Sequence, residues 1–336
     1  MKKILPLLLT ALVISACAVN ENTSTKQSSK SVDEGSGSAT IHYSYSPEMF
    51  TIVSPTGAPA LAFYNYAESG SFETNSVPNN IVAMMNKGEK DVVVLPTNAG
   101  VQAIVNKNAP YLIAATITFG NFYIVSMNND DNQVMDANDT ILLFQKNNVP
   151  DKIFHYVYGD TLNSALHYVN AVSDAASAVI GGKFSDPDLG EELVPNYVMI
   201  AEPALTNVMS KKGDAISVYA NIQEEYKKKS NNAELFQASV FIKNSIASEQ
   251  ARIFLDHLEK DINDAIKDPS KMSAGMSKAE DAATLYGVAP AMAEAVLRKN
   301  NGMGLGFKLA NGNKDAINTF LNIFGIEGIN EEIIFQ

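Results

Sequence analysis

The stretch DVVVLPTNAGVQAIVN, residues 91–106, decides the fold of this 336-residue chain. Residues 91–95 form a mostly apolar, valine-rich run, as expected for a strand that is buried on both faces. Pro96 ends this run, and the residues from Thr97 to Asn106 are typical of a helix. A buried strand that turns directly into a helix predicts a parallel β-sheet with helices on both of its faces.

The same alternation of strands and helices extends on both sides of this stretch. Ser54–Pro59 forms a loop rich in turn residues, with Pro59 suited to the first turn of a helix. The expected elements are strands at 49–53, 72–77, 91–95, 111–119 and 122–127, and helices at 60–64, 79–86 and 97–106.

A second series of the same kind follows a polar, turn-prone segment at 128–138, which we interpret as a crossing between domains. Its expected elements are strands at 140–144, 167–171 and 197–201, and helices at 150–158, 173–181 and 203–209, with Ser173 as a helix cap. The run 238–242 predicts a strand that returns to the first domain. From Glu249 onward, the pattern predicts mainly amphipathic helices.

The first 17 residues, MKKILPLLLTALVISAC, have the form of an export signal. Two lysines precede an apolar run that is too short to span a bilayer. The run ends in ISAC, which resembles the bacterial lipobox, and this implies that Cys17 is acylated and becomes the first mature residue. The alternative is an ordinary secretory signal with a chance cysteine. Residues 18–46 are rich in Ser, Thr, Asn and Gly, which predicts a flexible tether.

Composition excludes several classes of function. Cys17 is the only cysteine, so the chain has no disulfide framework, no cysteine-ligated metal and no other thiol nucleophile. A net charge of −12 disfavours nucleic acid and anionic membrane surfaces as partners. The four histidines have no metal-ligand spacing, and the motifs of P-loops, dinucleotide sites and nucleophile elbows are missing from the sequence. We therefore expect no catalytic residue, no cofactor and no metal.

Four loops at strand ends are candidates for ligand binding, because ligands of α/β sheets bind beyond the carboxyl ends of strands. The alternative for each loop is a satisfied helix cap or turn without a ligand. The candidate residues are Ser54, Thr56, Gly57 and Ala58 in the first loop, Thr97 and Asn98 in the second, Gly120 and Asn121 in the third, and Gln145 and Asn147 in the fourth.

Four further side chains each have two alternative roles. Glu202 either stabilises the helix that follows it or contacts the ligand. Lys146 either meets an anionic group or lies in solvent. An aromatic ring at a strand end, Phe119 or Phe122, either stacks on a ligand or packs in the core.

Three segments together resemble the solute-binding lipoproteins of bacterial ABC importers. They are TIVSPTGAPALAFYNY at 51–66, IVAMMNKGEKDVVVLPTNAGVQAIVNKNAPYLIAATITFGNFYIVS at 81–126, and YVMIAEPALTNVM at 197–209. The likeness is to the branch that includes taurine, aliphatic-sulfonate, nitrate and thiamine-pyrimidine-precursor binders. The chain departs from many relatives at Gln145–Asn148, where they have a loop that contains glycine, so the identity of the ligand is not carried over.

The resemblance implies an α/β fold of the type II periplasmic-binding-protein kind, a two-lobed clamp in which each lobe has a mainly parallel sheet flanked by helices. Lobe 1 is expected at 47–127 plus 238–336, and lobe 2 at 128–237. The implied function is capture of a small organic solute by a monomer, which is held at the outer face of the cell membrane by its lipid alone. The solute would pass to an ABC permease with its ATPase. The alternatives are a pyrimidine-precursor enzyme and a surface sensor or adhesin.

Overall fold

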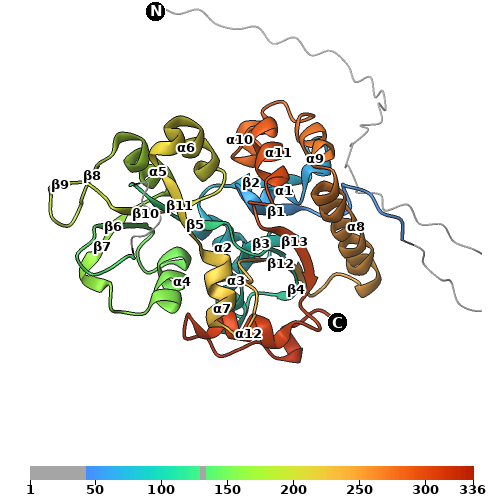
Figure 1. Ribbon diagram of the computed structural model, residues 1–336. Helices are drawn as coiled ribbons and strands as arrows, with labels where there is room; N and C mark the ends of the chain where they lie inside the picture. The colour runs from blue at the N-terminus through green and yellow to red at the C-terminus, as the bar shows by residue number, and fades with distance from the viewer. Residues whose placement is uncertain (1–42, 129–133) are drawn as a thin grey trace, which may run out of the picture.

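The computed structural model describes residues 43–128 and 134–336. Within these ranges the strands form a six-stranded sheet, a five-stranded sheet and a two-stranded hairpin. The two larger sheets are the centres of two α/β lobes that lie side by side in Figure 1. We call the lobe of the six-stranded sheet lobe 1 and the other lobe 2. The expected signal peptide, Cys17 and the tether as far as residue 42 lie outside the described residues.

Lobe 1 is built on a sheet with the strand order β13–β4–β12–β3–β1–β2. β1 is parallel to β2 and β3, and Ile52 of β1 lies opposite both Phe72 and Val92. β12 is antiparallel to β3 and β4, and β13 is antiparallel to β4. The strands are β1 (Ile52–Pro55), β2 (Phe72–Asn75), β3 (Val92–Pro96), β4 (Tyr111–Thr118), β12 (Ala238–Lys243) and β13 (Leu305–Leu309).

Lobe 2 has the strand order β11–β5–β10–β6–β7, in which β6 is parallel to β7 and β10, and β5 is antiparallel to β10 and β11. The short strands β8 and β9 form a separate hairpin. The strands are β5 (Phe122–Ser126), β6 (Ile141–Phe144), β7 (Leu166–Val169), β8 (Phe184–Ser185), β9 (Glu192–Leu193), β10 (Tyr197–Ala201) and β11 (Ser217–Asn221).

Helices cover the sheets of both lobes (Figure 1). In the described part of the chain, none of them is long and apolar enough to cross a membrane. The helices are α1 (Ala58–Leu61), α2 (Pro78–Lys87), α3 (Thr97–Lys107), α4 (Val149–Tyr158), α5 (Val172–Gly181), α6 (Ala204–Lys212), α7 (Ile222–Lys229), α8 (Ser248–Lys267), α9 (Pro269–Met276), α10 (Ala282–Tyr286), α11 (Pro290–Arg298) and α12 (Lys314–Asn322).

The buried central strands explain why the fold can be predicted from short apolar runs. Val92, Val93, Val94 and Leu95 of β3 are all fully buried, because alternate residues face opposite layers of the core. One face of β3 packs in the layer of α8, α9 and α11, and the other packs in the layer of α2 and α3. The apolar run is thus the feature that both layers of lobe 1 share.

The α/β alternation is confirmed, and both large sheets are mixed: four of six strands in lobe 1 and four of five in lobe 2 run in one direction. Strands joined through helices within one lobe run in parallel, as expected for such crossovers. β5 and β12 instead follow short crossings from the other lobe, and both run antiparallel to their neighbours. The first crossing also comes earlier than 128–138, since β5 already pairs within the sheet of lobe 2.

Three local expectations need correction. The region after Glu249 contains β13 as well as helices, because its edge pairs with β4. Ser173 lies inside α5 and does not cap it; the Asp174 carboxylate accepts a hydrogen bond from the Ala171 N–H at 3.1 Å instead. Tyr45 was assigned to the tether, but its ring stacks on His257 with the ring centroids 3.7 Å apart. The folded body therefore begins before residue 47.

Gly304 and Gly306 allow the start of β13 to approach the first crossing. A Cβ atom on Gly306 would lie 2.9 Å from the Phe119 ring, and one on Gly304 would lie 2.0 Å from the Gly120 carbonyl oxygen. The Phe119 N–H donates a hydrogen bond to the Gly304 carbonyl at 2.8 Å. Gly304 is thus needed for contact between the two backbones.

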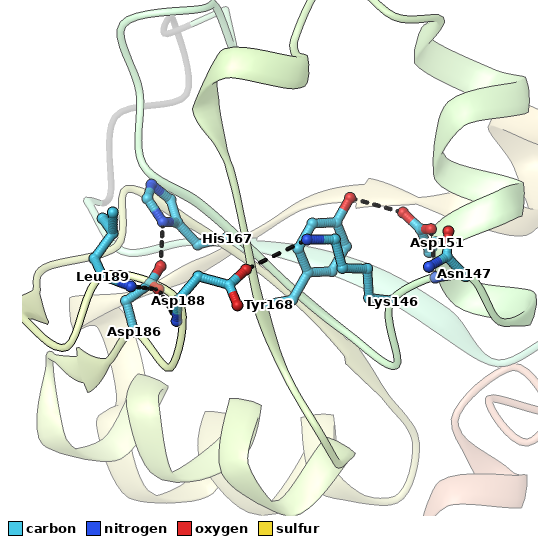
Figure 2. Close-up of polar contacts among 8 residues, drawn as sticks. All are labelled: Lys146, Asn147, Asp151, His167, Tyr168, Asp186, Asp188 and Leu189. Carbon is cyan, nitrogen blue, oxygen red and sulfur yellow. Dashed lines mark hydrogen bonds and ion pairs between the residues drawn. The ribbon is translucent and has the colours of Figure 1, made fainter.

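The β8–β9 hairpin is joined to β7 by Asp186 (Figure 2). Its carboxylate accepts hydrogen bonds from His167 Nδ1 at 2.5 Å and from the Asp188 and Leu189 N–H groups at 2.8 and 2.9 Å. Burial raises the pKa of this carboxyl, but the hydrogen bonds from His167 and the two amides outweigh burial. They hold the pKa of Asp186 below its ordinary value of 3.8.

We predict that Gly304→Ala destabilises the protein more than Gly312→Ala. Both residues have a positive φ, 62° and 97°, so both variants strain the backbone, by about 1–2 kcal/mol. Only Gly304→Ala also drives a methyl group into the Gly120 carbonyl, so its free energy of unfolding should fall by about 3 kcal/mol or more. Urea denaturation measures both variants, and equal losses would show that the close approach has no energetic weight.

A second prediction concerns acid stability. Because the pKa of Asp186 is lowered in the native state, its contribution is present above about pH 4 and is lost as pH falls further. Asp186→Asn should lower the free energy of unfolding by about 2 kcal/mol at pH 7, and by less at pH 3. The control is Asp188→Asn, which removes an exposed ion pair and should cost under about 1 kcal/mol. Urea titrations at both pH values test this prediction. A difference in unfolding free energy between wild type and Asp186→Asn that does not change with pH would contradict it.

Candidate functional site

A cavity of about 550 Å³ lies between the two lobes. Lobe 1 supplies the loops before α1, α2 and α3 to its wall, and lobe 2 supplies the loops before α4, α5 and α6. Residues next to the two crossings, Asn121, Phe122, Gln237 and Ala238, complete the lining. The cavity is thus an open cleft lined by strand-end loops of both lobes.

Seven of the eleven residues predicted from the strand-end loops and the Glu202–Pro203 turn line this cavity, and four do not. The lining residues among them are Thr56, Gly57, Ala58, Asn98, Asn121, Gln145 and Glu202. Those outside the lining are Ser54, Thr97, Gly120 and Asn147. All four predicted loops therefore contribute to one cavity, but some of their predicted residues do not line it.

Ser54 and Thr97 are fully buried behind the loops that line the cavity. The Thr97 hydroxyl forms a hydrogen bond with the Ser239 hydroxyl at 2.7 Å, and Ser239 in turn contacts the Thr116 hydroxyl at 2.8 Å. The Ser54 hydroxyl donates to the Pro55 carbonyl at 3.0 Å. For Ser54 and Thr97 the alternative is therefore correct: their hydroxyls form hydrogen bonds within the protein.

Gly120 and Asn147 shape the site without lining it. Gly120 has a φ of 97°, and a Cβ atom there would lie 2.5 Å from Gln223 Cγ, so the first crossing needs a glycine at this point. Asn147 has a φ of 65°, and its N–H donates to Asp151 Oδ2 at 2.7 Å. The nearly buried Asp151 also accepts a hydrogen bond from the Tyr168 hydroxyl at 2.9 Å (Figure 2).

Lys146 does not line the cavity, although it belongs to the same loop. Its Nζ lies 3.3 Å from Asp188 Oδ2 and 4.9 Å from the centroid of the Tyr168 ring. Figure 2 shows the lysine side chain directed along the loop toward the β8–β9 hairpin. This geometry therefore does not support a contact between Lys146 and an anionic group of the ligand.

The cavity floor is a hydrogen-bonded join between the two crossings and the turn after β10. Asn121 Nδ2 donates to the Glu202 carbonyl at 2.9 Å, and the Glu202 N–H donates to the Asn121 carbonyl at 3.0 Å. Gln237 Nε2 lies 3.4 Å from Asn121 Oδ1. The Gln237 carbonyl also accepts a hydrogen bond from the Thr97 N–H at 3.0 Å. Asn121 and Gln237 thus connect the segments that join the lobes.

Glu202 stabilises the helix that follows it, which is one of its two predicted roles, and it also lines the cavity. Its Oε2 accepts a hydrogen bond from the Thr206 N–H at 2.9 Å, and its Oε1 accepts one from the Thr206 hydroxyl at 2.8 Å. The carboxylate therefore occupies the N-terminus of α6, where the helix dipole favours negative charge. Carboxylate oxygens have spare lone pairs after these two bonds, so a contact with a ligand donor is chemically open.

Of the two aromatic rings at strand ends, Phe122 lines the cavity, whereas Phe119 packs against Phe236. Several other lining residues do not follow from the sequence analysis. The start of α2 had a signal, since Pro78 closes a predicted strand in the same way as Pro96. The missed residues include Val77, Pro78, Asn79, Phe144, Asn148, Val149, Pro150, Val172, Gln237 and Gly287.

The wall is mostly apolar and carries little charge. Among the described residues that line it, Glu202 is the sole charged side chain, and no histidine, cysteine, lysine or tyrosine occurs. Two lining residues keep a buried side-chain oxygen without a hydrogen-bond partner, Asn98 Oδ1 and Gln237 Oε1. Such oxygens cost about 1–3 kcal/mol each when unsatisfied. These features favour binding of a small molecule over acid–base chemistry.

Comparison with known proteins gives structural likeness alone. No family model and no curated protein matches the chain. An ABC transporter structure from Parabacteroides distasonis matches with a TM-score of 0.62 at 18% identity, covering 81% of this chain and 90% of its own. The periplasmic aliphatic sulphonate binding protein from Escherichia coli matches with a TM-score of 0.57 at 12% identity, covering 87% and 93%.

A third solved structure has the same arrangement. The ligand-binding component of an ABC-type import system from Staphylococcus aureus, determined with zinc bound, matches with a TM-score of 0.56 at 8% identity and covers 85% of this chain and 95% of its own. All three likenesses extend over most of both chains. The chain therefore has the two-lobed α/β fold of periplasmic solute-binding proteins, as the resemblance in its sequence predicted.

Proposed function

We propose that this protein is the extracytoplasmic solute-binding component of an ABC importer. The observation that carries the proposal is the cavity between the lobes, which is lined from both sides by loops at strand ends. Its volume of about 550 Å³ lies in the range of small-molecule sites. Two of the similar structures are named as an ABC transporter and as the ligand-binding component of an ABC-type import system, which supports the same role.

Binding would work by closure of the two lobes around a small organic solute. The lobes are joined by short crossings at Asn121 and Gln237, which lie at the cavity floor. A solute that touches Asn98 from lobe 1 and Gln145 from lobe 2 contacts both walls at once. Such a solute stabilises the closed form over the open one by its extra contacts. An ABC permease with its ATPase would then receive the solute from the closed form.

The anchor belongs to the same proposal. Acylated Cys17 would hold the mature chain at the outer face of the cell membrane by lipid, palmitate included, and the tether would allow the folded lobes to reach a permease. The folded protein would act as a monomer, since one copy contains the whole cavity lining. A net charge of −12 makes attraction to anionic lipid headgroups unfavourable, which leaves the lipid as the sole attachment.

We predict that a compact solute raises the melting temperature of the purified chain. A solute at 100 times its Kd adds about 2.7 kcal/mol of stability. A broad panel of small organic compounds, tested by thermal denaturation, should contain at least one such solute. If no compound in the panel shifts the melting temperature, the binding function is wrong.

The solute found in this way tests the site directly. Asn98→Ala should weaken its binding about tenfold, because one hydrogen bond at the cavity wall is lost. Asn106→Ala is the matched control, since Asn106 is exposed on the same helix and lies outside the lining. Titration calorimetry on both variants gives the two Kd values. Equal Kd values would place binding elsewhere.

A separate prediction concerns the anchor. In a bacterial host, Cys17→Ser should move the protein from the membrane fraction to the soluble fraction, and mass spectrometry of the wild type should show lipid on Cys17. Ser15→Ala changes a neighbouring residue of the signal and should leave the protein in the membrane fraction. A Cys17→Ser protein that stays with the membrane would rule out the lipid anchor.

A further inference from the structure

The charge of the cavity wall restricts the class of solute, if the proposed binding function is correct. Glu202, 5% exposed, is the one charged side chain among the described lining residues. The nearest basic candidate, Lys146, is paired with Asp188 outside the lining. An anionic solute would therefore leave water for a low-dielectric wall that holds a carboxylate and no cation, which is unfavourable.

Four of the six helix N-termini around the cavity do little to compensate for this lack of cations. α1, α2 and α4 each have proline in their first two positions, and proline has no N–H to donate. At α6 the Glu202 carboxylate already accepts the Thr206 N–H. Four of the helix starts at the wall are thus poorer in free N–H groups than an anion-binding terminus requires.

The polar side chains at the floor bond to one another. The Glu202 carbonyl accepts a hydrogen bond from Asn121 Nδ2, and Asn121 Oδ1 is the partner of Gln237 Nε2. Gln237 Oε1 is buried without a hydrogen-bond partner, and so is Asn98 Oδ1 in lobe 1. Each amide nitrogen carries a second N–H, so these side chains can still donate to a solute. The Glu202 carboxylate is therefore the group at the cavity that distinguishes solutes by charge.

We infer that the solute is a compact, non-anionic molecule that presents an N–H donor to the Glu202 carboxylate. An uncharged amide or a nitrogen cation meets this requirement, because each brings an N–H donor to the carboxylate and neither is repelled by it. A sulfonate, a carboxylate or a nitrate brings acceptors alone. The class of solute therefore differs from that of the sulphonate-binding protein that shares the fold.

The inference is tested with compounds that share one carbon skeleton and differ in charge. The probes are benzoate, benzenesulfonate, benzamide and benzamidinium, together with the four corresponding cyclohexyl compounds and every solute found in the broad panel. Melting temperature and calorimetric Kd are measured for the full chain. We expect the binders to be amides or nitrogen cations, each at least about tenfold tighter than its carboxylate and sulfonate counterparts. An anionic binder that equals or exceeds its uncharged counterpart overturns the inference and leaves the binding function intact.

A variant pair tests the role of the carboxylate. Glu202→Gln should weaken the amide or cation about fivefold or more, and should narrow its advantage over the matched anion. Glu280→Gln removes one charge from an exposed position outside the lining and should leave both affinities unchanged. Equal effects of the two variants would contradict a direct contact with Glu202. If no compound of any charge binds, the proposed function fails, and the inference about the solute fails with it.

Discussion

The hydrogen-bonded join of Asn121, Glu202 and Gln237 is the constraint on which the arrangement of the two lobes depends. One amide side chain reaches the turn after β10 and the second crossing, so both connections between the sheets meet at one place. The backbone of Gly304 packs against the first crossing from the other side. The two crossings thus meet where the strand-end loops of both lobes face one cavity. The cavity is thus a consequence of where the crossings are fixed.

The same join determines the chemistry of the floor. The one charge among the described lining residues is the Glu202 carboxylate, which accepts two hydrogen bonds from Thr206. The rest of the wall is formed largely by prolines, glycines, apolar side chains and uncharged amides. In a site of this kind, shape and apolar contact supply most of the affinity, and the few polar groups decide which molecules are oriented correctly. Selectivity against anions then requires no dedicated repulsive residue beyond Glu202.

The sequence predicts the fold well where burial dictates it and poorly where distant pairing does. β3 is readable because its apolar run is buried on both faces. β13 is not readable, because its short LGFKL segment becomes a strand only by pairing with the edge of β4, almost 200 residues earlier. Strand direction also depends on distant pairing. β5 and β12 are correctly predicted as strands, but the sequence pattern does not show that the crossings between the lobes make them antiparallel.

The candidate site shows the same division at the level of single residues. Loop position is local, so the lining at Thr56, Asn98 and Gln145 follows from strand ends alone. The partner of a side chain is not a local property. The Thr97 hydroxyl is hydrogen-bonded to Ser239, 142 residues away, and Lys146 is paired with Asp188, 42 residues away. No sequence pattern within the loops predicts either partner. The consequence is largest for charge. From the sequence, Lys146 either meets an anionic group or lies in solvent. Its pairing with Asp188 outside the lining leaves Glu202 as the one charged side chain among the described lining residues.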